Sequence, residues 1–143
     1  LVNPIFAQSN HNIMSSFPLF PQHDSMDCGP ACLRMVAQHY GRHYTLESLR
    51  QKCHISREGV SLLGISEAAE GIGFKTVGVH LSFDQLKEDQ PLPCIVHWKQ
   101  RHFVVVYKIR KDHVYVADPA HGLVKFHTKE FLNGWISRKE TRA

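Results

Sequence analysis

The sequence of 143 residues lacks the features that define several common classes of protein. No apolar run approaches the roughly 18–20 residues that a membrane-spanning helix needs, and the beginning carries no convincing secretory signal. A nucleotide-binding motif of the form G-x-x-x-x-G-K-[ST] is also missing. We see no internal repeat or low-complexity tract. These absences favour one globular domain, which we expect to be soluble.

The sequence also lacks a large excess of charge of one sign. The formal net charge is only +4, and the basic residues are scattered apart from short clusters such as KIRKD. A nucleic-acid interface needs a basic stripe or patch. We therefore expect no nucleic-acid partner.

Cysteine is present, but not in the number that a small disulfide-stabilised domain uses. Cys28, Cys32, Cys53 and Cys94 are expected to be reduced, in an intracellular protein. The first two could form a zinc site with Cys94 and His97, but positions 94 and 97 of a strand face opposite sides. The spacing also matches no common zinc template. We expect neither a metal nor another cofactor.

The apolar residues change from helical to strand-like spacing along the chain. The expected helices cover 28–40, 46–53, a segment from Ser61 to 71–73, a short segment after Ser82 and KEFLNGW, with Asp27, Thr45, Ser61, Ser82 and Thr128 as caps. The expected strands cover 74–80, 93–99, 102–109, 113–118 and LVKFH. This order predicts an α+β domain with an N-terminal helical half and a C-terminal antiparallel sheet half. We assign the domain to 21–143 and treat 1–20 as an N-terminal extension, with Met14 as a candidate natural start and 1–13 as an added or flexible segment.

Cys28 stands at the front of the first predicted helix, two residues before Pro30. Cysteine attacks as a thiolate, and a helix N-terminus stabilises that negative charge. Gly29 would let the backbone approach a ligand closely, and Cys32, one turn further along, is expected to pack in the core. Position alone suits a structural cysteine better than a nucleophile, so the assignment needs partners elsewhere.

A nucleophilic cysteine needs a base, usually histidine, and the base needs an orienting group. His102 opens the run HFVVVY, and Asp118 closes the next run, HVYVAD. If the two runs form an antiparallel hairpin, His102 and Asp118 meet at the same end of the sheet. We expect His97 in the core or on a sheet face, and rank His121 and Asn133 lower as base and orienter.

The oxyanion that forms during thiolate attack needs hydrogen-bond donors. The backbone N–H of Cys28 is one candidate. Gln22, six positions earlier, is the other. Its spacing fits an exposed loop glutamine equally well.

The motifs QHDSMDCGPACL, HFVVVY and VADPA, with GVSLLGISEAAEGIGFKT between them, resemble the peptidase domain of bacteriocin-exporting ABC transporters. The members of that family are papain-like cysteine peptidases that remove double-glycine leader peptides. The resemblance covers the chain from about Pro21 to Trp135. It implies a papain-like fold in which Cys28 is the nucleophile, His102 the general base and then acid, Asp118 the orienter and Gln22 the oxyanion-hole amide.

The resemblance also implies partners and a location. The substrate would be a precursor peptide with a Gly-Gly leader, held in a cleft too narrow for side chains at the glycines. Transmembrane and ATP-binding domains of an exporter would belong to a longer protein, on the cytoplasmic side of a bacterial membrane. Two alternatives stay open: a non-catalytic leader-binding module, and another papain-like amide hydrolase.

Overall fold

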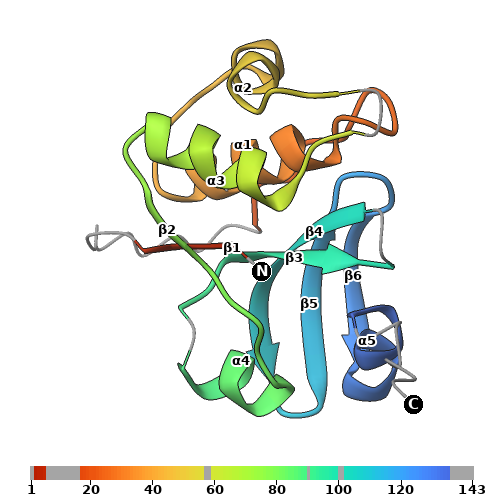
Figure 1. Ribbon diagram of the computed structural model, residues 1–143. Coiled ribbons are helices and arrows are strands. Elements are labelled where there is room, and N and C mark those ends of the chain that lie inside the picture. The colour runs from red at the N-terminus through yellow and green to blue at the C-terminus, as the bar shows by residue number, and fades with distance from the viewer. Residues whose placement is uncertain (1, 6–16, 57–58, 90, 100–101, 136–143) are drawn as a thin grey trace, which may run out of the picture.

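A computed structural model describes residues 2–5, 17–56, 59–89, 91–99 and 102–135. Three helices form one half of the molecule and a twisted sheet forms the other (Figure 1). The helices of the first half are α1 (Cys28–His39), α2 (Leu46–Lys52) and α3 (Leu62–Gly71). Two more helices, α4 (Phe83–Asp89) and α5 (Thr128–Trp135), accompany the sheet. The predicted α+β architecture is confirmed.

The sheet has six strands in the order β2-β1-β3-β4-β5-β6, and every neighbouring pair is antiparallel. The strands are β1 (Val2–Ile5), β2 (Lys75–Gly78), β3 (Cys94–Trp98), β4 (His102–Arg110), β5 (His113–Asp118) and β6 (Gly122–His127). Consecutive strands from β3 to β6 are neighbours in the sheet. This arrangement places the beginning of β4 and the end of β5 at the same end of the sheet.

The first strand was not predicted from the sequence. Val2–Ile5 pair with β2 along their whole length, and Val2 also pairs with Ile95 of β3. Phe17 lies in the core, with its ring stacked on Tyr107 at a centroid distance of 4.7 Å. Parts of the segment assigned as an extension therefore pack with the domain. The boundary at residue 20 stays a prediction, and Met14 lies outside the described residues.

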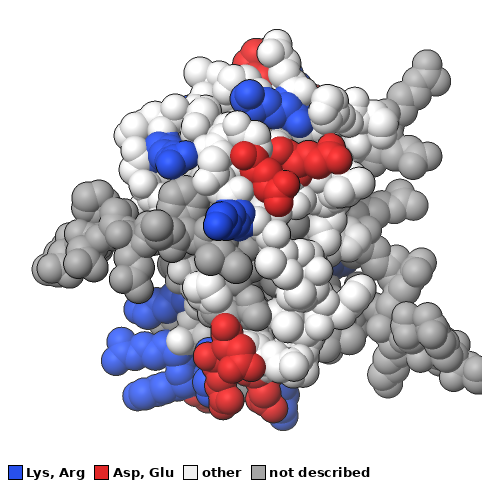
Figure 2. Space-filling view, turned by 60° about the vertical axis from the view of Figure 1, so that its left-hand side comes forward, with Lys and Arg blue, Asp and Glu red and all other residues white. Residues whose placement is uncertain are grey.

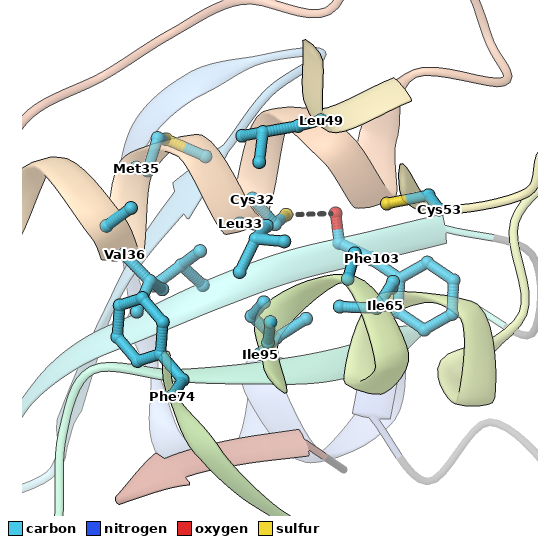
Figure 3. Packing of buried hydrophobic residues seen from close by; sticks show 14 of the residues in the cluster. Cys32, Leu33, Met35, Val36, Leu49, Cys53, Ile65, Phe74, Ile95 and Phe103 are labelled. Atoms are coloured by element: carbon cyan, nitrogen blue, oxygen red, sulfur yellow. Dashed lines mark hydrogen bonds between the residues drawn. The ribbon is translucent and has the colours of Figure 1, made fainter. Parts of the chain in front are cut away.

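The two faces of the sheet bury different hydrophobic clusters. On one face, Cys32, Leu33 and Val36 of α1 pack with the helical layer and with Ile95, Phe103 and Val105 of the sheet (Figure 3). On the other face, Val96, Trp98 and Val104 pack with Leu86 of α4 and Phe131 of α5. Successive strand residues alternate between the clusters because strand side chains point to opposite faces in turn. Within the described residues, no helix is long and apolar enough to cross a membrane.

Three of the predicted helix caps are confirmed. Thr45 Oγ1 accepts the backbone N–H of Ser48, and Ser61 Oγ accepts that of Gly64. Ser82 Oγ accepts the N–H of Gln85, whose side chain in turn accepts the N–H of Ser82. Each bond satisfies a backbone donor that the first turn of a helix leaves free.

The other two caps differ from the prediction. Asp27 occupies the N-cap position of α1, but its carboxylate makes no capping bond and instead binds Arg50 of α2 at 2.6 and 2.9 Å. Thr128 is already the first residue of α5. The cap is His127, whose ring Nδ1 accepts the N–H of Lys129 at 3.3 Å. The partner of Asp27 lies on another helix, so the local sequence does not reveal it.

Charged side chains of both signs lie next to one another on the face drawn in Figure 2. Basic and acidic groups adjoin at its helical end and again at its opposite end. Arg50 and Glu47 of α2 form one contact between opposite charges, at 3.5 Å. On this face the positive charge is thus divided between mixed patches.

Candidate active site

Cys28 is the first residue of α1, and only 4% of its surface is exposed. The backbone N–H groups of Cys28 and Gly29 have no acceptor within the helix, because they belong to its first turn. Gly29 has a packing role that the sequence did not indicate. A Cβ at this buried glycine would collide with Val60 Cγ1 and press on Ile65 of α3. The missing side chain therefore lets α3 approach the start of α1, which helps fix Cys28 in place.

The structure brings His102 and Asp118 together at the end of the sheet where β4 begins and β5 ends. His102 Nε2 and Asp118 Oδ1 are 2.6 Å apart. The Asp118 carboxylate also accepts the N–H of Ala120 at 2.8 Å, and its second oxygen lies 3.0 Å from His121 Nδ1. Asp118 is 5% exposed, so two further neighbours hold a buried carboxylate against the ring of His102.

The pKa values of the pair are shifted in opposite directions. Burial alone would lower the pKa of His102, but hydrogen bonds to Asp118 and Cys28, with the negative charge of both, raise it to about 9. Burial would raise the pKa of Asp118, but the bonds from His102 and Ala120 and the charge of His102 lower it to about 2. Near neutral pH the pair is therefore imidazolium and carboxylate. Because Asp118 occupies Nε2, the Nδ1 atom remains to exchange a proton with Cys28.

Gln22 lies beside this pair. Its backbone N–H donates to the carbonyl of Pro119 at 2.9 Å, which ties its loop to the segment after Asp118. The side chain is half-buried and lines the same cleft as His102. Its Oε1 atom is buried without a hydrogen-bond partner in the described part of the chain. The amide therefore faces the site rather than bulk solvent.

Of the residues ranked lower in the sequence analysis, His121 contacts Asp118, whereas His97 and Asn133 lie elsewhere. His97 has an exposed side chain on β3, with its ring stacked on Phe103 at 4.9 Å, and Asn133 is exposed on α5. Sequence reasoning missed the contacts of Ala120 and His121 with Asp118. The signal was available, because an aspartate often accepts the N–H two residues further along.

The other three cysteines are buried and form no disulfide. Cys32 Sγ donates to the carbonyl of Phe103 at 3.2 Å (Figure 3), and burial, with the charges of Cys28 and Asp118, raises its pKa well above the ordinary value. Burial raises the pKa values of Cys53 and Cys94 to about 12. These thiols are poor nucleophiles. Among the described residues, no group of three or more His, Cys, Asp or Glu is arranged to hold a metal ion.

The geometry brings Cys28, His102 and Asp118 together on an α+β scaffold, and comparison with known proteins shows the family. The model of the Peptidase C39 family matches residues 16–138, and the chain belongs to this family. It is a cysteine peptidase.

Solved structures of peptidase domains are similar over most of their length. A double glycine motif protease from an AMS/PCAT transporter, crystallised with the leader peptide, is 34% identical with a TM-score of 0.80, over 83% of this chain and 85% of that one. The peptidase domain of Streptococcus ComA is 32% identical with a TM-score of 0.78, over 85% and 93%.

Curated relatives are larger proteins. The lactococcin-G-processing and transport ATP-binding protein LagD of Lactococcus lactis is 37% identical over 119 residues, which are 80% of this chain and 17% of LagD. The colicin V secretion/processing ATP-binding protein CvaB of Escherichia coli is 37% identical over 120 residues, 84% of this chain and 17% of CvaB. The chain thus spans about a sixth of the length of these relatives.

Proposed function

We propose that the protein removes double-glycine leaders from precursor peptides, as the peptidase part of a peptide exporter. The observation that carries this proposal is the 2.6 Å contact of His102 with Asp118, together with the hydrogen bond to Cys28 at the start of α1 that helps raise the pKa of His102. The similarity to a double glycine motif protease crystallised with its leader peptide supports the choice of substrate.

Cys28, His102 and Asp118 divide the chemistry. The proton of the Cys28 thiol passes to His102 before the attack, which gives the protonated ring described above, and Cys28 Sγ then attacks the carbonyl carbon of the second glycine. The C–N bond then breaks, His102 gives its proton to the leaving amine, and the leader remains on Cys28 as a thioester. Water, activated by His102, hydrolyses this thioester. Asp118 keeps the ring oriented and stabilises its charged form.

The negative oxygen of the tetrahedral intermediate needs two donors. The backbone N–H of Cys28 at the helix N-terminus is one. The side-chain amide of Gln22 is the other, and its place in the cleft beside His102 supports this role. Because the Gln22 loop is bonded to Pro119, the donor and the His102–Asp118 pair belong to one connected unit.

The longer relatives support a setting for the domain. In the full-length protein, residues 21–143 would be the peptidase domain after an N-terminal extension, joined to transmembrane and ATP-binding domains on the cytoplasmic side of a bacterial membrane. The names of LagD and CvaB describe proteins that combine processing with transport or secretion.

The test incubates the protein with a double-glycine precursor peptide and locates the cut by mass spectrometry. We expect cleavage directly after Gly-Gly by the parent and none by Cys28→Ala. A peptide with alanine in place of the second glycine should be a poor substrate. Equal cleavage by both proteins would overturn the proposal, and an inactive parent that still binds the peptide would favour the leader-binding alternative.

A further inference from the structure

The cleft beside His102 extends beyond His102 and Asp118 and offers space for part of a substrate. Its volume is about 540 Å³, within the range of sites that bind a small ligand. Gln22, His102 and Asp118 line one part of it, and Trp98, Val124 and Phe126 line another. We propose that this cleft binds the first residue of the exported peptide, directly after the cut, and that it selects an apolar side chain there. The inference rests on the proposed function and adds a second determinant of specificity.

Strand register places the cleft on one face of the sheet. Trp98 is the cross-strand partner of His102, so their side chains share a face. On β6, Val124 and Phe126 are two and four residues beyond the partner of Asp118 and share that face as well. Helix α1, which carries Cys28, packs on the opposite face. The cleft therefore extends from His102 away from the nucleophile.

The order of bond changes then fixes which part of the substrate enters the cleft. The new C–S bond joins Cys28 to the second glycine, so the leader remains on the α1 side. The broken C–N bond releases the amine of the first exported residue, and that nitrogen must lie within hydrogen-bond reach of His102 to take its proton. The side chain of this residue is thereby directed to the cleft side of His102.

The walls of the cleft indicate the chemical class of that side chain. The ring centroids of Trp98 and Phe126 lie 5.2 Å apart, and the side chain of Val124 is half-buried. The Trp98 ring is fixed from behind by α5, because it packs on Gly134, where a Cβ would overlap it. An aliphatic or aromatic side chain gains by covering such a preformed apolar surface. The lining also includes Lys99 and His121, and its one carboxylate, Asp118, is already bound by His102, Ala120 and His121. A basic side chain would therefore lose water without gaining a free acidic partner among the described lining residues.

The first experiment uses the unaltered protein and peptides that differ only in the residue after Gly-Gly, which is Leu, Phe, Gly, Asp or Lys. We expect kcat/KM for Leu and Phe to exceed that for Lys by about tenfold or more, the lower end of what an apolar pocket achieves. Equal values for all five would overturn the inference and leave the proposed function intact. Failure to cleave any of them would contradict the proposed function itself.

The second experiment assigns the preference to the cleft. Val124→Trp fills it and should reduce the Leu-to-Gly ratio of kcat/KM to about one or below. Leu123→Trp is the matched control, since Leu123 is the neighbouring residue on β6, points to the other face and is 41% exposed. It should retain the parent ratio. A leader ending in a Gly-Gly ethyl thioester has no residue after the cut, so its turnover corrects for general damage. An unchanged ratio in Val124→Trp, or an equal drop in Leu123→Trp, would contradict the assignment.

Discussion

His102 is the residue at which burial and local charge act most clearly against each other. Burial disfavours its charged form, yet Asp118 and Cys28 outweigh burial and hold its pKa at about 9, above the ordinary value of 6.5. The contribution of the protonated ring to the free energy of unfolding is therefore fully present below about pH 6.5, and it is lost as the pH rises through about 9. For Asp118 the sign is reversed: its contribution is present above 3.8 and lost as the pH falls through about 2.

The first prediction concerns the pH dependence of cleavage. We expect kcat/KM for a leader peptide to fall at high pH with an apparent pKa of about 9, because the free enzyme then loses the His102 proton. Asp118→Asn removes the negative charge that holds this proton, so the fall should move to lower pH. NMR titration of the ring measures the same shift without requiring activity.

His39 provides an internal control for that titration. Burial lowers its pKa below 6.5, and Asp118→Asn should leave it unchanged because His39 lies at the far end of α1 from Cys28. An apparent pKa of His102 that is the same in both proteins would contradict the account.

At the level of single residues, the sequence predicted the groups whose position follows from an element boundary. Cys28 begins a helix, and His102 and Asp118 lie at paired strand ends, so their meeting follows from periodicity and hairpin geometry. The partner of Asp27 could not be predicted, because Arg50 reaches it from another helix. The packing of Gly29 against Val60 likewise depends on how α3 docks on α1.

Among the elements, those with a clear apolar period were predicted within a few residues. The exception is β1, whose four residues VNPI contain a proline and show too short a pattern to indicate a strand. Its partners β2 and β3 come much later in the chain. Such pairing depends on the tertiary fold and cannot be predicted from local propensity.

Helix α5 supports the Trp98 wall of the cleft, and this support can be tested by mutation. Gly134→Ala would place a Cβ inside the Trp98 ring, which Phe126 and Phe131 hold at centroid distances of 5.2 and 5.4 Å. We expect a loss of about 1–3 kcal/mol in the free energy of unfolding, as for other overpacked cores. Urea denaturation measures it.

Gly71→Ala is the matched control for that substitution. Gly71 also lies near the end of a helix, but a Cβ there would meet no atom within 4 Å. Alanine favours helix over glycine by up to about 1 kcal/mol, so this variant should be as stable as the parent or more so. Equal destabilisation by both substitutions would show that the packing of Trp98 on Gly134 is not the cause.

For the whole molecule, the site exists only because the two halves meet. The helical half contributes Cys28, and the sheet half contributes His102 and Asp118. The family comparison and the geometry lead independently to a cysteine peptidase. What the chain shares with its longer relatives is this peptidase part, about a sixth of their length.

The most direct test of the central claim asks which sulfur reacts with a leader. A leader peptide ending in Gly-Gly chloromethyl ketone is incubated with the protein, and the adduct is located by mass spectrometry. We predict a single adduct on Cys28, formed more slowly in His102→Ala and absent in Cys28→Ala. No adduct, or an adduct on Cys32, Cys53 or Cys94, would contradict the assignment of Cys28 as the nucleophile.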